Sequence, residues 1–172
     1  MNNRLQARLS GIGGFRTLVA AVAVAMAGAS SASAQTATQT VTFQVTAINQ
    51  IGVTGAPSLI VNTAVPGNPP SSATSAGNTW AVTCNQTGAK VTASIPSAMP
   101  VGLTLSANLA APAGGTSAGL VALGVVATDM VTGITKLNAS SLGLTYQLDA
   151  TTAAGVVASS TRVVTYTLTG GT

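Results

Sequence analysis

The stretch TQTVTFQVTA, Thr38 to Ala47, decides the fold class of this 172-residue chain. Apolar side chains alternate with Thr and Gln along it, and the apolar set is Val41, Phe43, Val45 and Ala47. A period of two is typical of a β-strand that has one buried face. The stretch is therefore predicted to be a strand that docks on a sheet, either in its own domain or in a second copy of the chain.

The residues before this strand have the features of a secretory signal peptide. A basic start is followed by a short apolar run, Thr17 to Ala29, and by the small residues Ala32-Ser33-Ala34, which predict cleavage before Gln35. The apolar run is shorter than the roughly 20 residues that a membrane-spanning helix needs. We therefore expect a signal peptide over 1–34 and one domain over 35–172.

This leader predicts a secreted protein that is extracellular or on the cell surface. If the source has two membranes, the protein passes through the periplasm. After cleavage we expect no membrane span. Two alternatives stay open: an N-terminal membrane anchor, and cleavage of a type IV prepilin at Gly14-Phe15. The prepilin alternative lacks the Glu expected five residues into the mature chain, where Val19 stands.

Few charges remain once the leader is removed, because three of the six cationic residues lie in it. Three cations then stand against two anions, and these are Lys90, Lys136, Arg162, Asp129 and Asp149. The pI near 10.0 is thus mostly a property of the leader, and no basic patch indicates a nucleic-acid partner. A nearly uncharged surface tolerates packing against copies of itself, although compositional drift explains the same feature.

Alternating or apolar segments continue to the end of the chain, separated by turn residues. With no long amphipathic helix, they predict an all-β domain, a single immunoglobulin-like or jelly-roll-like β-sandwich. The two segments around Asn85–Gly88 are typical of a hairpin. The expected strands are 58–62, 80–84, 89–95, 101–109, 120–127, 129–136, 142–149 and 161–169, with a helical turn over 152–157. The expected core contains Phe43, Trp80, Val91, Leu103, Leu105, Val121, Leu144, Tyr146 and Tyr166.

The composition argues against catalysis. The chain has no His, and its only two acidic residues are Asp129 and Asp149. Nucleophile activation by His is therefore excluded, and the two carboxylates stand at a turn and a strand end, which are ordinary places for Asp. A Ser-Lys pair through Lys90 or Lys136 has no supporting motif. We therefore expect that the protein is not an enzyme and that it has no catalytic residue, no cofactor and no metal site.

Binding alternatives rest on few residues. A sugar-binding platform needs exposed aromatic side chains, but those of this chain lie in register with apolar neighbours. The sequons at Asn85 and Asn138 leave a surface glycan open as a modification. Cys84, the only cysteine, is predicted to be a small buried residue, with an intermolecular disulfide as the alternative.

The chain resembles small secreted bacterial β-sandwich proteins of the fimbrial or filament-subunit type. The resemblance spans most of the mature chain. It is carried by the leader, by VTFQVTAINQIGVTG (Val41 to Gly55), by MPVGLTLSANLAAP (Met99 to Pro112) and by RVVTYTLT (Arg162 to Thr169). The chain lacks the disulfide pair that many pilins carry.

The resemblance implies a non-catalytic structural subunit of a cell-surface or extracellular filament, whose subunits share a strand with copies of themselves. The residues of the shared strand are then Val41, Phe43, Val45 and Ala47. The alternative is a secreted monomeric adhesin or a carbohydrate-binding module.

Overall fold

The computed structural model describes residues 34–172, so the predicted signal peptide, with Ala32 of its cleavage site, lies outside the described residues except for Ala34. Residues Phe43–Thr172 form one compact unit, which is described by itself. Its elements are β1 (Asn49–Thr54), β2 (Ala73–Thr74), β3 (Asn78–Cys84), β4 (Ala89–Ser94), β5 (Leu103–Leu109), β6 (Thr116–Ser117), β7 (Val121–Ala122), β8 (Thr128–Ile134), β9 (Leu137–Ala150), the single-turn helix η1 (Thr152–Ala154) and β10 (Thr165–Thr169).

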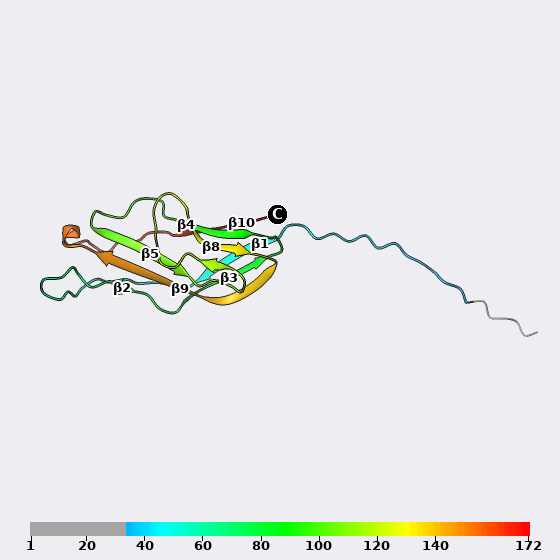
Figure 1. Ribbon diagram of the computed structural model, residues 1–172, viewed down its shortest axis with the longest axis horizontal. Coiled ribbons are helices and arrows are strands. Elements are labelled where there is room, and N and C mark those ends of the chain that lie inside the picture. Colours follow the sequence, from blue (N-terminus) through cyan, green and yellow to red (C-terminus); the bar gives the residue numbers. More distant parts are fainter. Residues whose placement is uncertain (1–33) are drawn as a thin grey trace, which may run out of the picture. The chain divides into compact units, whose positions relative to one another are not determined.

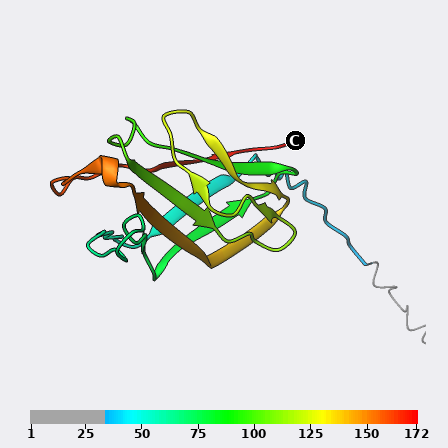
Figure 2. The ribbon, with the colours of Figure 1, turned by 60° about the vertical axis from the view of Figure 1, so that its left-hand side comes forward.

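The strands form two antiparallel sheets, which confirms the all-β class and is consistent with the predicted β-sandwich (Figure 1). One sheet has six strands in the order β1-β3-β9-β5-β7, and β2 pairs with β9 in line with β3. The other sheet has four strands in the order β10-β4-β8-β6. Figure 2 shows β9 running beside β5 along the six-stranded sheet. The finer immunoglobulin-like or jelly-roll-like assignment stays a prediction.

From β4 onward, each strand lies in the opposite sheet from the strand before it. The predicted hairpin around Asn85–Gly88 is therefore wrong: β3 pairs with β1 and β9, whereas β4 pairs with β10 and β8. The side chains of β3 and β4 do face each other across the core, as predicted. Consequently, no two strands that are consecutive in the sequence pair with each other.

The turn between β3 and β4 crosses from one sheet to the other because it packs on a second crossing. Its Gly88 adopts φ 74°, a conformation that favours glycine. The Gln86 carbonyl accepts a hydrogen bond of 2.9 Å from the backbone N–H of Lys136, in the turn that carries β8 into β9. This hydrogen bond thus joins two adjacent crossings.

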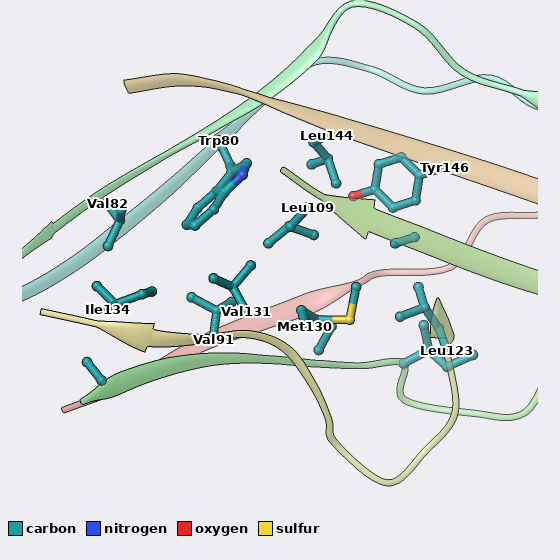
Figure 3. Packing of buried hydrophobic residues seen from close by; sticks show 14 of the residues in the cluster. Trp80, Val82, Val91, Leu109, Leu123, Met130, Val131, Ile134, Leu144 and Tyr146 are labelled. Atoms are coloured by element: carbon teal, nitrogen blue, oxygen red, sulfur yellow. The ribbon is translucent and has the colours of Figure 1, made fainter. Parts of the chain in front are cut away.

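The core lies between the sheets, where apolar side chains of both point toward one another (Figure 3). Strand β3 shows why: Trp80, Val82 and Cys84 are buried and alternate with more exposed residues. The core prediction is confirmed for Trp80, Val91, Leu105, Leu144 and Tyr146, whereas Leu103, Val121 and Tyr166 are half-buried and Phe43 is exposed.

Apart from 38–47, which belongs to no strand, two predicted strands are wrong. Residues 58–62 belong to no strand, and only Val121 and Ala122 of the apolar run 120–127 pair, as β7. Val125 and Val126 are exposed because β7 is the last strand of its sheet and nothing covers the chain beyond it. The helical turn predicted over 152–157 is present as the shorter η1.

Candidate functional site

The predicted first strand is not paired in the structure. Residues 34–48 belong to no strand, and the chain enters the sheet only at Asn49. Val41, Phe43 and Val45 have exposed fractions of 72%, 90% and 78%, and Ala47 is also exposed. The expectation that Phe43 lies in the core is therefore wrong. The physical reason is local: no Gly or Pro stands between Gln35 and β1, so the segment has no turn residue with which to fold back.

Asn85, directly after β3, holds the chain just before β1. Its side-chain Nδ2 donates a hydrogen bond of 2.7 Å to the Thr46 carbonyl, and its Oδ1 accepts one of 2.7 Å from the Ile48 N–H. Its backbone N–H also donates to the Ile48 carbonyl at 3.2 Å. Asn85 thereby prolongs the β1–β3 ladder by one pair. Sequence reasoning assigned Asn85 only to a turn; its place one residue beyond a strand was the available signal.

The apolar core is incomplete along one border, where β1 ends the six-stranded sheet and β10 ends the four-stranded sheet. These two edge strands lie side by side (Figure 1). Ile51 is half-buried and Val53 is 50% exposed, whereas Val82 and Trp80, their partners on β3, are 2% and 1% exposed. The core-facing apolar side chains of the six-stranded sheet are thus less buried on β1 than on β3.

Strand β10 shows the same loss of cover. Tyr166 and Leu168 pair with Ala93 and Val91 of β4, which are 1% and 0% exposed, yet both are only half-buried. Val164, which precedes the strand, is also half-buried and packs against the core. Half-buried apolar residues on both edges mark a site where one more apolar strand face would complete the core.

The outer edge of β10 lacks the usual protection of an edge strand. Its sequence, TYTLT, contains no charge and no Pro, and the strand pairs on one side only, with β4. Edge strands of stable monomers are commonly guarded by charged residues, Pro or bulges, because unpaired backbone groups attract a further strand. The β10 edge is therefore open to strand addition.

The border between β1 and β10 is closed at one end, where Gly170 follows β10. A Cβ atom on Gly170 would lie 1.8 Å from Gln86 Oε1 and 2.6 Å from Asn49 Nδ2, and Asn49 is the first residue of β1. On the other side of β10, Thr172 exchanges two backbone hydrogen bonds with Thr87, of 2.9 and 3.1 Å, which continue the pairing of β10 with β4. The incomplete stretch of core therefore begins beyond Gly170 and runs toward Val164.

The structure does not bring the acidic residues together. Asp129, on β8, forms an ion pair of 2.9 Å with Lys90, and both side chains are about half exposed. Asp149, on β9 of the other sheet, accepts hydrogen bonds from Ser72 and Gln147. Within residues 34–172, no group of three or more His, Cys, Asp or Glu side chains is placed to hold a metal ion.

Cys84 is buried, with 2% of its surface exposed, as predicted for a small core residue. Its Sγ lies 3.2 Å from Asn49 Oδ1 and 3.7 Å from the Gln86 carbonyl. The sequon residue Asn85 uses its side-chain amide in the contacts to Thr46 and Ile48, whereas Asn138 of the second sequon is exposed on β9.

One open pocket of about 430 Å³ lies at the loops next to η1. It is lined by Gly67, Asn68, Pro69, Thr151 and Thr152, which include no aromatic and no charged side chain. A platform for stacking a sugar ring therefore does not form there. In the described part of the chain, no helix is long and apolar enough to cross a membrane.

No protein-family model, curated protein or solved structure matches this chain.

Proposed function

We propose that this protein is a secreted, non-catalytic structural subunit that polymerises into an extracellular or cell-surface filament. Residues 38–45 of one chain add as a strand to the free edge of β10 in the next chain. The observation that carries this proposal is that two features of the chain complement each other. One is an unpaired segment with three exposed apolar side chains, and the other is a core whose apolar rows are half covered at β10 and β1.

Two energetic terms support the match. The added strand forms a ladder of backbone hydrogen bonds with β10, and its side chains Val41, Phe43 and Val45 enter the half-covered stretch of core, as in β-augmentation. Each such side chain contributes about 1.5 to 3 kcal/mol when it is fully buried. The near absence of charge on both partners removes the electrostatic repulsion that opposes association of identical subunits.

The geometry of this contact leads to a polymer. The segment and the β10 edge are different surfaces, so each chain offers one of each, and a contact between unlike surfaces repeats into a fibre unless it closes into a ring. Secretion through the predicted signal peptide places such a fibre outside the cell. For the alternative of a monomeric adhesin or a carbohydrate-binding module, the pocket beside η1 in the described part of the chain offers no aromatic side chain.

A peptide-binding experiment tests the proposal. A variant that begins at Thr46 lacks the segment but keeps the contacts of Asn85, so its two sheets are expected to fold. A labelled peptide of residues 38–47 should bind this variant with saturation and raise its melting temperature. The control peptide replaces Val41, Phe43 and Val45 by Ser, which preserves the backbone and removes the apolar face. Equal binding of both peptides, or binding of neither, refutes strand addition.

A further inference from the structure

The contacts of Asn85 define the point at which the segment becomes free of the domain. Thr46 and Ile48 are both held by the Asn85 side chain, at 2.7 Å each. Residues 43–45, which belong to the same compact unit, form no hydrogen bond to the other described residues of that unit. Thr46 is therefore the first residue of this stretch that Asn85 binds.

The held residues continue the line of β1. Ile48 uses both its N–H and its carbonyl on Asn85, so residues 46–48 extend the antiparallel ladder of β1 and β3 by one pair. Asn49 and Gly170 both meet Gln86, so β1 starts where β10 ends. A segment that filled the gap of its own domain would have to reverse direction within residues 46–48. The Asn85 contacts oppose that reversal.

We propose that Asn85 is a positioning residue that directs residues 38–45 away from their own β10 edge and toward a second copy of the chain. This inference rests on the proposed function. Without Asn85, residues 46–48 gain backbone freedom, and an intramolecular strand competes at an effective concentration in the millimolar range, typical of short flexible linkers. The expected product is a closed monomer whose own segment occupies its β10 edge.

The test compares Asn85→Ala and Asn85→Asp with the control Asn138→Ala, each in the protein that begins at Gln35. Asn85→Asp keeps an acceptor for the Ile48 N–H but replaces the donor to the Thr46 carbonyl by a carboxylate oxygen that repels it, so this variant should release Thr46 as Asn85→Ala does. Asn138 is an exposed Asn on β9, which pairs with β3 and not with β1. Light scattering follows polymer growth, and binding of the labelled 38–47 peptide reports whether the β10 edge is free.

Asn85→Ala should polymerise about tenfold more slowly than the wild type, the effect of roughly one to two lost hydrogen bonds. Its monomers should bind the peptide about tenfold more weakly, Asn85→Asp should behave in the same way, and Asn138→Ala should match the wild type. The variants that begin at Thr46 should bind the peptide equally with Asn or Ala at position 85, which shows that the domain is folded.

The failure of this inference and the failure of the proposed function give different results. If Asn85→Ala polymerises at the wild-type rate while the shortened protein binds the peptide, the positioning role is wrong and strand addition stands. If Asn85→Ala polymerises slowly but its monomers bind the peptide as tightly as wild-type monomers do, self-docking is wrong. If the shortened protein does not bind the peptide at all, the proposed function falls and the role of Asn85 falls with it.

Discussion

The phenol oxygens of Tyr146 and Tyr166 lie 3.0 Å apart, and this hydrogen bond joins β9 of the six-stranded sheet to β10 of the four-stranded sheet. Tyr146 is 7% exposed and Tyr166 is half-buried. The pair therefore ties β10, the proposed acceptor strand, to the centre of the opposite sheet. An acceptor edge has to hold its position before a neighbouring strand arrives, and this contact helps to do so.

Removing one of the two hydroxyls should weaken the domain. Tyr166→Phe leaves the Tyr146 hydroxyl without its partner, and we expect a loss of about 1 to 3 kcal/mol in the free energy of unfolding. Urea unfolding of Tyr166→Phe, Tyr146→Phe and the double variant measures the coupling between the two hydroxyls. A coupling energy of zero would show that the contact does not stabilise the domain.

Stability should also fall at high pH through Tyr166. Burial, the hydrogen bond with Tyr146 and the charge on Tyr146 all raise the pKa of Tyr166 far above its ordinary value of 10.0. A raised pKa means that folding favours the protonated phenol, so this contribution is complete below about pH 10, the unfolded value, and is lost as the pH rises above it. Unfolding midpoints between pH 8 and pH 11.5 should fall less steeply for Tyr166→Phe than for the wild type. Parallel curves contradict this assignment.

Two aromatic side chains should respond in opposite ways to truncation. Trp80 is 1% exposed, and its Nε1 donates a hydrogen bond of 3.1 Å to the Ala110 carbonyl, so Trp80→Ala should lower the free energy of unfolding by about 3 to 5 kcal/mol. Phe43 is 90% exposed, so Phe43→Ala should leave the unfolding of the isolated chain unchanged within about 0.5 kcal/mol. Both are measured by urea unfolding at concentrations too low for assembly. A large loss for Phe43→Ala would place its ring inside its own domain.

The close packing at the end of β10 should make Gly171 intolerant of a side chain. A methyl group there meets the Thr87 carbonyl oxygen, a backbone atom that cannot turn aside, and Gly171→Ala should cost about 1 to 3 kcal/mol. Gly124→Ala is the matched control, because a Cβ atom at Gly124 has no atom within 4 Å. Equal thermal midpoints for the two variants would show that the end of β10 is free to move.

Period-two alternation predicted most of the strands because it reports which side chains face the core. The segments 80–84, 89–95, 101–109, 129–136 and 142–149 all overlap strands of the structure, with β9 longer than expected. Alternation does not report the partner strand. The turn Asn85–Gly88 suits a hairpin equally well, but in the structure it joins strands of different sheets, and its Gln86 contacts Lys136.

The candidate site could be predicted in part. The alternation of Val41, Phe43 and Val45 indicated a strand that needs a sheet to pair with. The absence of charge on 165–169 was also visible in the sequence. The half-covered border between β1 and β10 was not visible, because it depends on which strands end the two sheets. The hydrogen bonds of the Asn85 side chain to Ile48 and Thr46 could not be predicted either, because these residues are 37 and 39 positions away from Asn85 in the sequence.

Electron microscopy of the purified protein that begins at Gln35 tests the central claim most directly. The comparison is between the wild type, Phe43→Asp, and the control Val126→Asp, which places the same charge on an exposed Val of the β7–β8 loop. We predict filaments for the wild type and for Val126→Asp, and discrete particles for Phe43→Asp. Discrete wild-type particles at every concentration, or filaments of Phe43→Asp as abundant as those of the wild type, would contradict assembly through this segment.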